Sequence, residues 1–288
     1  MVTNNIRDLA VGQGAYSFLL NPQGHILGDL YAYNRGDALM VDTDRSQLEK
    51  IVATFDHYII MDDVEVADVS GQFASSGIFG PTAGEVLASA GFQLPDLKPL
   101  QVADVAWGPT KVSVVRGERE AFPSFEIWAA SEATPGAHQG FVSGGATPVS
   151  EEALELYRVA LGVPRYGQDI RERDLPQETE QQRALNFNKG CYVGQEIVER
   201  IRSRGNVHRT FTGFYFAGPP PAAGTKIQSQ GKEIGEITSA TTIPSSRGDR
   251  AVGLGYIRRE VGVPGKEVRV GDSVATVMAP PFVDLFGD

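Results

Sequence analysis

The chain has 288 residues, about twice the length of a typical domain, so the sequence predicts at least two domains. Hydrophobic residues make up 41% of the chain and charged residues 22%, a composition that excludes wholesale disorder and low-complexity or collagen-like classes. The net charge of −10, from 26 Lys and Arg against 36 Asp and Glu, disfavours a protein whose whole surface holds nucleic acid or anionic lipid.

The cysteine, histidine and hydropathy patterns narrow the chemistry further. Cys191 is the only cysteine, so no intrachain disulfide forms, and one thiolate cannot by itself complete a structural zinc site or hold an iron–sulfur cluster. The four histidines have no metal-binding spacing, so we expect no metal site. The sequence has neither an apolar signal-peptide core near its start nor a stretch of the ~20 apolar residues that span a membrane. We therefore expect a cytoplasmic protein.

The first half of the chain predicts a mixture of strands and helices. Residues 16–41 alternate apolar and polar side chains around two turn signals, which predicts a three-stranded meander. Residues 46–57 have helical spacing behind a cap at Asp44 or Ser46. We expect strands at 64–69 and 75–79, a helix at 82–90, and strands at 102–105, 111–115 and 125–130. This β-α-β-β-α-β alternation predicts a small ferredoxin-like α+β domain at about 46–130.

The second half begins with a connection and ends in β structure. Residues 131–149 are rich in Gly, Ser, Thr and Pro, and residues 149–161 predict a helix. The inner face of that helix is expected to carry Ala153, Leu154, Tyr157, Ala160 and Leu161. We expect strands at 211–216, 235–240, 251–257 and 266–278, with a hairpin at 230–231. Short strands with glycine-rich turns predict a small barrel or sandwich.

The densest chemical signal is the segment 189–196, Lys-Gly-Cys-Tyr-Val-Gly-Gln-Glu, which leads into a helix. Its two glycines indicate a tight strand-to-helix passage in which the backbone approaches something closely. A lysine and a helix N-terminus near Cys191 favour a reactive thiolate, whereas an unpaired cysteine is more often a small buried apolar residue. Two interpretations fit Lys189, Gln195 and Glu196 equally well. They could belong to a binding site, or they could lie on an ordinary solvated surface.

Two further features have a functional and a structural interpretation. Residues 189–209 contain five basic and two acidic side chains, which could hold a phosphate chain, RNA or a polyglutamate tail, or form a solvated helix face. Asp29 interrupts an apolar strand and could bind or deprotonate an amine-bearing ligand. A strand whose side chains alternate between buried and exposed positions explains Asp29 equally well.

The segment 189–196 resembles the K-G-C-F/Y-x-G-Q-E signature of the YgfZ family, folate-binding proteins related to the aminomethyltransferase, or T-protein, of the glycine cleavage system. The resemblance covers nearly the whole chain, because 16–33, 157–167 and 235–240 are similar to the family's LLN-x-x-G hairpin, R-x-x-x-G-x-P helix exit and G-x-I-T-S-A strand. It implies an α+β fold of three domains: a discontinuous folate-binding, ferredoxin-like unit at 1–45 and 131–205, an inserted ferredoxin-like unit at 46–130, and a C-terminal β-barrel at 206–288. Met1–Asn5 resembles a stretch inside the first family domain, so we expect the family's opening strand and helix to be absent.

The resemblance also implies a ligand and site residues. Tetrahydrofolate or a one-carbon derivative is expected in the central opening, with Cys191 and Lys189 at or near it and Gln195 and Glu196 completing the motif. Asp29 matches a carboxylate of the T-protein relatives that is expected near the folate N5.

Two functions follow from the resemblance. The first is an auxiliary protein that supports the assembly or repair of iron–sulfur enzymes, including tRNA-modifying ones. The alternative is an aminomethyltransferase of the glycine cleavage type. Asp29 favours the alternative, whereas the cysteine motif and Ala160, which replaces a T-protein glutamate, favour the first function. Apart from the resemblance, the basic stretch at 189–209 leaves open an RNA-binding module that contacts tRNA.

Overall fold

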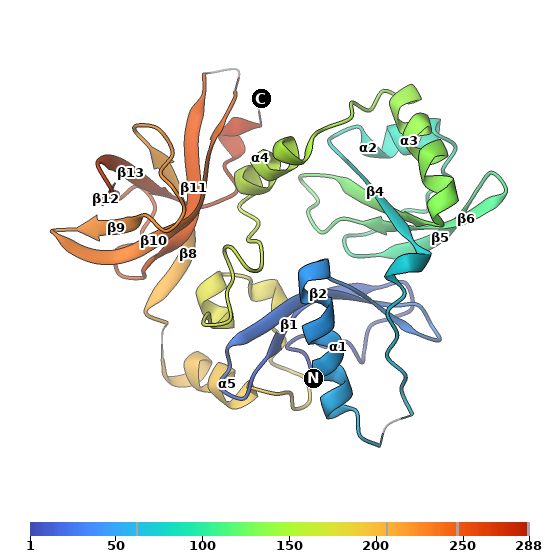
Figure 1. The fold of residues 1–288 in the computed structure, drawn as a ribbon, viewed down its shortest axis with the longest axis horizontal. Coiled ribbons are helices and arrows are strands. Elements are labelled where there is room, and N and C mark those ends of the chain that lie inside the picture. Colours follow the sequence, from blue (N-terminus) through green and yellow to red (C-terminus); the bar gives the residue numbers. More distant parts are fainter. Residues whose placement is uncertain (62, 206, 246–247, 287–288) are drawn as a thin grey trace. The chain divides into compact units, whose positions relative to one another are not determined.

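The computed structural model describes residues 1–61, 63–205, 207–245 and 248–286 (Figure 1). The chain forms two compact units: a first unit of Met1–Thr3, Phe18–Asp29 and Val149–Asp288, and a second unit of Asn4–Ser17 and Leu30–Pro148. The division falls within strands β1 (Gly14–Leu20) and β2 (Ile26–Asn34). The mixture of helices and strands confirms the predicted α+β class.

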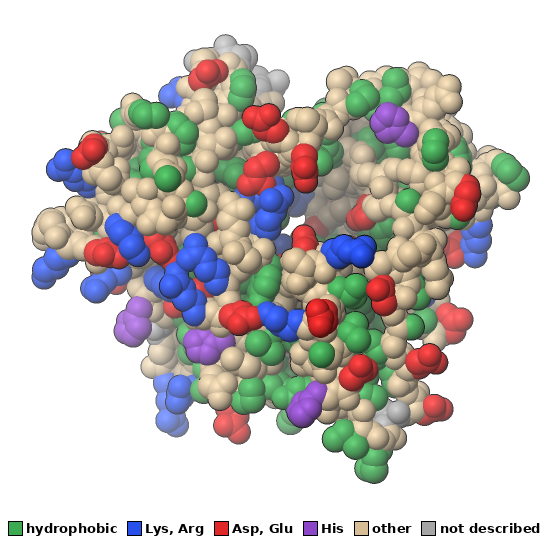
Figure 2. All heavy atoms as spheres, viewed as in Figure 1, with side chains coloured by type: hydrophobic (Ala, Val, Ile, Leu, Met, Phe, Trp, Pro, Cys, Tyr) green, Lys and Arg blue, Asp and Glu red, His purple; other side chains and the backbone are tan. Residues whose placement is uncertain are grey.

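The two units differ in charge. The sequence of the second unit contains 8 Lys and Arg against 17 Asp and Glu, whereas the first unit contains 18 against 19. Figure 2 shows basic side chains gathered beside the barrel strands of the first unit. Nearly all of the net negative charge of the chain is therefore carried by the second unit.

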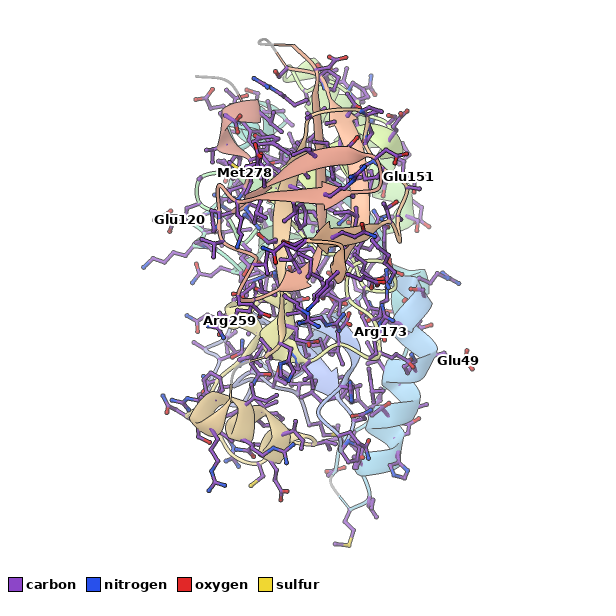
Figure 3. The ribbon with its side chains drawn as sticks, turned by 90° about the vertical axis from the view of Figure 1, so that its left-hand side faces the viewer. Glu49, Glu120, Glu151, Arg173, Arg259 and Met278 are labelled. Carbon is purple, nitrogen blue, oxygen red and sulfur yellow. The ribbon has the colours of Figure 1, made fainter. Side chains whose placement is uncertain are left out.

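The first unit is built around a closed six-stranded antiparallel barrel with the strand order β10-β11-β8-β13-β12-β9. Its strands are β8 (Arg209–Phe216), β9 (Lys226–Ser229), β10 (Lys232–Ile243), β11 (Arg250–Arg258), β12 (Glu267–Val270) and β13 (Ser273–Met278). Alternate apolar side chains fill the interior, and Met278 marks the end of β13 in Figure 3. The predicted barrel and its 230–231 hairpin are confirmed, and a turn at Gly271 divides the strand expected at 266–278 into two.

Helix α4 (Glu151–Leu161) packs on the outside of this barrel. Its first turn is capped by Ser150, whose hydroxyl accepts a hydrogen bond from Ala153 N at 3.2 Å, and it ends at Gly162 in the left-handed conformation. The last turn, Val159–Leu161, is buried. Leu154, which was predicted on the inner face, is 44% exposed, because the barrel covers only the C-terminal part of the helix.

A buried ionic network joins α4 to strand β10. The Asp169 side chain is fully buried and pairs with Arg158, whose Nη1 lies 2.7 Å from Oδ2. The hydroxyls of Thr238 and Ser239 donate hydrogen bonds to the other carboxylate oxygen. Each buried oxygen of Asp169 therefore has donors, which is the condition for burying a charge without a large loss of stability.

The second unit contains one whole antiparallel sheet and part of another. The predicted meander is confirmed as the sheet β1-β2-β3, in which β3 spans Leu39–Asp42. The other sheet has the order β4-β7-β6-β5, with β4 (Ala74–Phe79), β5 (Val102–Trp107), β6 (Thr110–Arg116) and β7 (Ser124–Ala129). Helices α2 (Ala83–Ser89) and α3 (Thr134–Ser143) cover one face of that sheet and bury its apolar core (Figure 1).

The predicted order of elements in this region needs two corrections. The segment Val64–Val69 is not a strand: Val64 is 59% exposed and the segment pairs with no strand of the described chain. The region 131–149, expected as a connection, contains α3, so the observed order is β4-α2-β5-β6-β7-α3. The glycines of α3 allow close packing, because a Cβ on Gly140 would lie 3.2 Å from Ala90 Cβ.

The predicted helix at 46–57 is confirmed as α1 (Leu48–Tyr58), which follows a short 3-10 turn. Asp44 caps that turn, since its carboxylate accepts a hydrogen bond from Ser46 N at 2.8 Å. Within the described ranges, no helix is long and apolar enough to cross a membrane.

The hydroxyl of Tyr256 on β11 gives a test of the barrel packing. Tyr256 is 2% exposed, and no described residue forms a hydrogen bond with its hydroxyl. An unpaired buried hydroxyl costs free energy, so Tyr256→Phe should raise the free energy of unfolding by about 1 kcal/mol. Urea unfolding measures this change. Tyr215→Phe is the control, because the Tyr215 hydroxyl donates to Asp284 and its loss should not stabilise the protein. A destabilised Tyr256→Phe variant would contradict the prediction.

Candidate functional site

The segment 189–196 lies in the first unit and packs against the turn between β1 and β2. Gly194 precedes helix α5 (Gln195–Arg204) with a φ of 81°, and a Cβ there would lie 2.6 Å from the carbonyl oxygen of Asn21. A Cβ on Gly24 would lie 2.8 Å from Ile197 Cβ in α5. The predicted close approach of backbone is confirmed at Gly194. At Gly190 it is wrong, because a Cβ there would meet nothing within 4 Å.

Lys189 and Gln195 fix the shape of this segment. Lys189 Nζ donates a hydrogen bond to Val2 O at 2.6 Å and lies 5.1 Å from the centre of the Tyr192 ring. Burial lowers the pKa of Lys189. Gln195 Oε1 accepts a hydrogen bond from Tyr192 N at 3.3 Å, which closes the turn before α5. The segment enters α5 from a turn rather than from a strand, which corrects the expected strand-to-helix passage.

Cys191 and Glu196 are exposed. The interpretation of Cys191 as a small buried residue is therefore wrong. Tyr192 takes the buried position instead, with 9% of its surface exposed, because its ring is held under the Lys189 ammonium. The structure thus separates the motif into side chains that hold its conformation and two side chains that face solvent.

Asp29 lies on β2 and is half-buried. Strand alternation places Leu27, Asp29 and Tyr31 on one face of β2, while the intervening residues are buried. The strand is held in the first unit by two bonds: the Tyr166 hydroxyl donates to Leu27 O at 2.6 Å, and Ile26 N donates to a backbone oxygen at 3.0 Å. Asp29 is therefore carried by a fixed strand.

The basic stretch at 189–209 offers less positive charge to a polyanion than its sequence predicts. The reason is that Arg209 belongs to an ionic network at the barrel. Its Nη2 lies 2.6 Å from Asp174 Oδ1 and 2.9 Å from Glu178 Oε2, and its guanidinium lies 4.6 Å from the centre of the Tyr256 ring. These two carboxylates raise the pKa of Arg209 although burial opposes them. Arg209 is thus compensated within the protein and cannot contribute to a polyanion site.

The exposed part of the basic stretch is on α5. Arg200 and Arg204 are exposed, whereas Arg202 lies 4.1 Å from the centre of the Phe187 ring and 3.7 Å from the Glu199 carboxylate. The described residues contain no group of three or more His, Cys, Asp or Glu side chains that could hold a metal ion.

A second group of candidate side chains lies in the second unit and was not predicted. We call it the aromatic–carboxylate cluster; it consists of Tyr31, Tyr33, Asp42, Glu126 and Trp128. The rings of Tyr31 and Tyr33 are stacked with centres 6.4 Å apart, and Trp128 meets Tyr33 edge-on at 5.4 Å. Asp42 on β3 lies directly opposite Tyr31 on β2, and Glu126 lies two residues from Trp128 on β7.

The two carboxylates of the cluster are incompletely satisfied. Oε1 of Glu126 accepts hydrogen bonds from Trp128 Nε1 at 2.9 Å and from the Ser75 hydroxyl. Among the described residues, none donates to Oε2 of Glu126 or to the Asp42 carboxylate, and no basic side chain pairs with either. Burial and the nearby Glu126 charge raise the pKa of Asp42 to about 6.

The chemistry of the cluster fits one class of ligand. Aromatic faces bind flat rings, and half-buried carboxylate oxygens without donors bind N–H groups. The arrangement therefore suits a planar heterocycle whose edge carries N–H donors. The sequence shows an alternation of tyrosines at 31–33 and an acidic residue at 42, but Glu126 and Trp128 are too distant in the chain for any local pattern to join them.

Comparisons with known proteins identify similar sequences and folds. The GCVT N-terminal domain matches residues 1–189, and the glycine cleavage T-protein C-terminal barrel domain matches residues 209–284. The aminomethyltransferase of Rubrobacter xylanophilus is 27% identical over 265 residues, which cover 90% of this chain and 70% of that protein. A chloroplastic protein of Arabidopsis thaliana, At1g60990, named as a transferase, is 23% identical over 281 residues; they cover 96% of this chain but only 64% of that protein.

One solved structure confirms the fold. The glycine cleavage system aminomethyltransferase T from Bartonella henselae matches with a TM-score of 0.86 at 22% sequence identity, covering 99% of this chain and 80% of that one. This agreement, together with the closed barrel, confirms the predicted T-protein-like fold.

The contact between Gly194 and the β1–β2 turn can be tested by substitution. Gly194→Ala should lower the free energy of unfolding by about 2 kcal/mol, because it adds a Cβ at a positive φ and against a backbone oxygen. Gly190→Ala is the matched control and should change stability by less than about 0.5 kcal/mol, because its Cβ meets open space. Thermal unfolding of both variants measures the difference, and equal melting temperatures would contradict the interpretation.

The raised pKa of Asp42 predicts a pH dependence of stability. Between about pH 4 and about pH 6 the folded state binds more protons at Asp42 than the unfolded state, so the free energy of unfolding falls as the pH rises. Asp42→Asn should therefore melt at a higher temperature than the parent at pH 7.5, and the difference should disappear below about pH 4.

The control for this experiment is Asp104→Asn. Burial opposes ionisation of Asp104, but hydrogen bonds from Ser113, Lys111 and Arg35 lower its pKa to about 2. This variant should be less stable than the parent at pH 7.5. An Asp42→Asn variant that is also destabilised at pH 7.5 would show that the Asp42 charge is compensated in the folded protein.

Proposed function

The chain belongs to the glycine cleavage T-protein family, with its GCVT N-terminal domain and T-protein C-terminal barrel domain, and from this membership we propose that it is a tetrahydrofolate-dependent aminomethyltransferase. The observation that carries the proposal is the aromatic–carboxylate cluster, because it offers what a pterin ring requires. Relatives from several bacteria are named aminomethyltransferases, which supports the same activity.

The pterin of tetrahydrofolate is a flat heterocycle with an amino group beside a ring N–H. A carboxylate accepts both hydrogens in one bidentate contact, and Glu126 Oε2 has no donor of its own among the described residues. Tyr33 and Trp128 are buried, so the half-buried ring of Tyr31, stacked on Tyr33, supplies the apolar surface for the heterocycle. The cluster would therefore hold the pterin by its donor edge and leave the one-carbon nitrogens directed away from it.

The proposed reaction transfers a methylene group. The carrier thioether bond to an aminomethyl group breaks, the methylene carbon becomes bonded to N5 and N10 of tetrahydrofolate, and ammonia leaves. The two hydrogens lost from N5 and N10 are recovered on the carrier thiol and on ammonia, so atoms and electrons balance. We assign Asp29 of the first unit as the group that accepts a proton in this reaction, because its carboxylate is half-buried on a strand that hydrogen bonds hold in place.

A second candidate function is supported by a different residue. Cys191 is a free and exposed cysteine in a segment that resembles the YgfZ signature. An auxiliary protein for iron–sulfur enzymes, among them tRNA-modifying ones, would use this thiol together with bound tetrahydrofolate. The exposed arginines of α5 would then contact tRNA.

Ligand binding to the cluster can be measured by fluorescence. Trp107→Phe leaves Trp128 as the only indole of the chain, and tetrahydrofolate should quench its emission. Adding Glu126→Gln should weaken binding by about tenfold or more, because a charge-assisted hydrogen bond is lost. Glu120→Gln, in the exposed turn that precedes β7, is the control and should leave binding unchanged. Unquenched Trp128 at saturating tetrahydrofolate would overturn the placement of the pterin.

Turnover distinguishes the two functions. With an aminomethylated lipoyl carrier and tetrahydrofolate, the parent should release ammonia, Asp29→Asn should reduce the rate by about a hundredfold or more, and Cys191→Ala should retain it. Absence of ammonia release, together with failure of Cys191→Ala to restore iron–sulfur enzyme activity in cells lacking the gene, would favour the second candidate.

A further inference from the structure

The half of β2 that carries Asp29 is held differently from the rest of the strand. Strand β3 pairs with residues 31–34 of β2 and does not extend to Asp29. In the first unit, the half with Asp29 is contacted by residues 166–174, which we call loop 166–174. The Tyr166 hydroxyl of this loop donates a hydrogen bond to Leu27 O at 2.6 Å. The position of Asp29 therefore depends on what holds loop 166–174.

Asp174 forms a further contact between this loop and β2, and it also belongs to an ionic network. Its backbone oxygen accepts a hydrogen bond from Ile26 N at 3.0 Å. Its side chain is 1% exposed, and its Oδ1 lies 2.6 Å from Arg209 Nη2. Its Oδ2 accepts a hydrogen bond from Arg171 N at 2.7 Å. The backbone and the carboxylate of one buried residue thus connect β2 with Arg209 on β8.

Arg209 compensates two buried carboxylates at this place. The Nη2 atom that pairs with Asp174 also lies 2.9 Å from Glu178 Oε2. The guanidinium lies 4.6 Å from the centre of the buried Tyr256 ring, which fixes its position from another side. Without the guanidinium, the two carboxylates would repel each other and lose a buried partner. Asp174 would then move, and its hydrogen bond with Ile26 would weaken.

The loop has a separate attachment to the barrel that does not involve Arg209. Arg171 Nη1 lies 3.0 Å from Glu236 Oε1 on β10, and Arg173, labelled in Figure 3, pairs with the same carboxylate. These contacts keep the loop on the barrel when Arg209 is changed. The effect of losing Arg209 is therefore expected at Asp174 and the start of β2.

We infer that Arg209 is a positioning residue for Asp29. It acts through Asp174, which holds the start of β2 and so fixes the carboxylate that accepts a proton in the proposed transfer. A small displacement of a proton-accepting group lowers the rate of a reaction strongly, because the geometry of proton transfer is narrow. This inference rests on the proposed function, because it requires Asp29 to act in the transfer.

Hydrogen exchange of the full chain tests the structural link without any substrate. Arg209→Gln should make the Ile26 amide exchange about tenfold faster or more, because its acceptor on Asp174 is displaced. The fully buried amide of Ile237, which donates to Thr225 O at 2.9 Å in the barrel, reports on global unfolding and should speed up less. Equal acceleration of both amides would overturn the inference.

Turnover in a double-mutant cycle tests the role of Arg209 in the reaction. With an aminomethylated lipoyl carrier and tetrahydrofolate, Arg209→Gln should lower kcat about tenfold or more and change the KM for tetrahydrofolate less than about twofold. In the Asp29→Asn background, Arg209→Gln should lower kcat no further, because the group that it positions is already lost. An arginine that only stabilises the fold would lower kcat by the same factor in both backgrounds.

Two further variants serve as controls for this cycle. Arg209→Lys keeps the positive charge and should retain more activity than Arg209→Gln. Arg258 lies opposite Arg209 on β11 and its side chain is 60% exposed, so Arg258→Gln should change neither kcat nor the exchange of Ile26.

The outcomes separate this inference from the proposed function. Ammonia release by the parent, with equal losses of kcat in both backgrounds, would overturn the role of Arg209 and leave the proposed function standing. A parent that releases no ammonia would overturn both. If Arg209→Gln does not fold, Asp174→Asn replaces it in both experiments, because it breaks the same link while Arg209 keeps its contact with Glu178.

Discussion

The contact between Gly194 and the turn at Asn21–Gly24 is the constraint on which the site segment depends. Both sides of the contact are backbone, so neither can move aside for a side chain. It fixes the start of α5 against the β1–β2 turn, and Lys189 fixes the other end of the segment at Val2. The same turn leads directly into β2, the strand that carries Asp29. The glycine motif and the half-buried carboxylate are thus positioned by one piece of backbone.

The buried polar groups of the two units contrast in how they are satisfied. In the first unit, Asp169 is surrounded by donors from Arg158, Thr238 and Ser239, and its burial holds α4 on the barrel. In the second unit, Asp42 and Glu126 are partly buried beside aromatic rings with few donors. The first arrangement is complete and therefore structural. The second is incomplete, and incomplete satisfaction at a partly exposed position is a property of binding sites.

The sequence predicted the elements whose signals are local. The barrel strands, the meander and α4 follow from alternation, turn residues and caps, all of which act within a few residues. Helix α3 was missed because its glycines allow close packing on α2, whereas within the sequence the same glycines indicate turns. Val64–Val69 has strand-like composition but no partner strand in the described chain. The aromatic–carboxylate cluster could not be predicted, because β2, β3 and β7 meet only through sheet packing.

The structural role of the 189–196 motif limits what the motif can say about function. Lys189, Gly194 and Gln195 are explained by the backbone they hold, so any family member with this hairpin contact has use for them whatever it catalyses. Cys191 and Glu196 are exposed, and the conformation of the segment does not depend on their side chains. We therefore expect a transferase and an iron–sulfur auxiliary protein to differ in their use of these two side chains and of Asp29. A match to the whole octapeptide identifies the fold of the segment more strongly than it identifies the reaction.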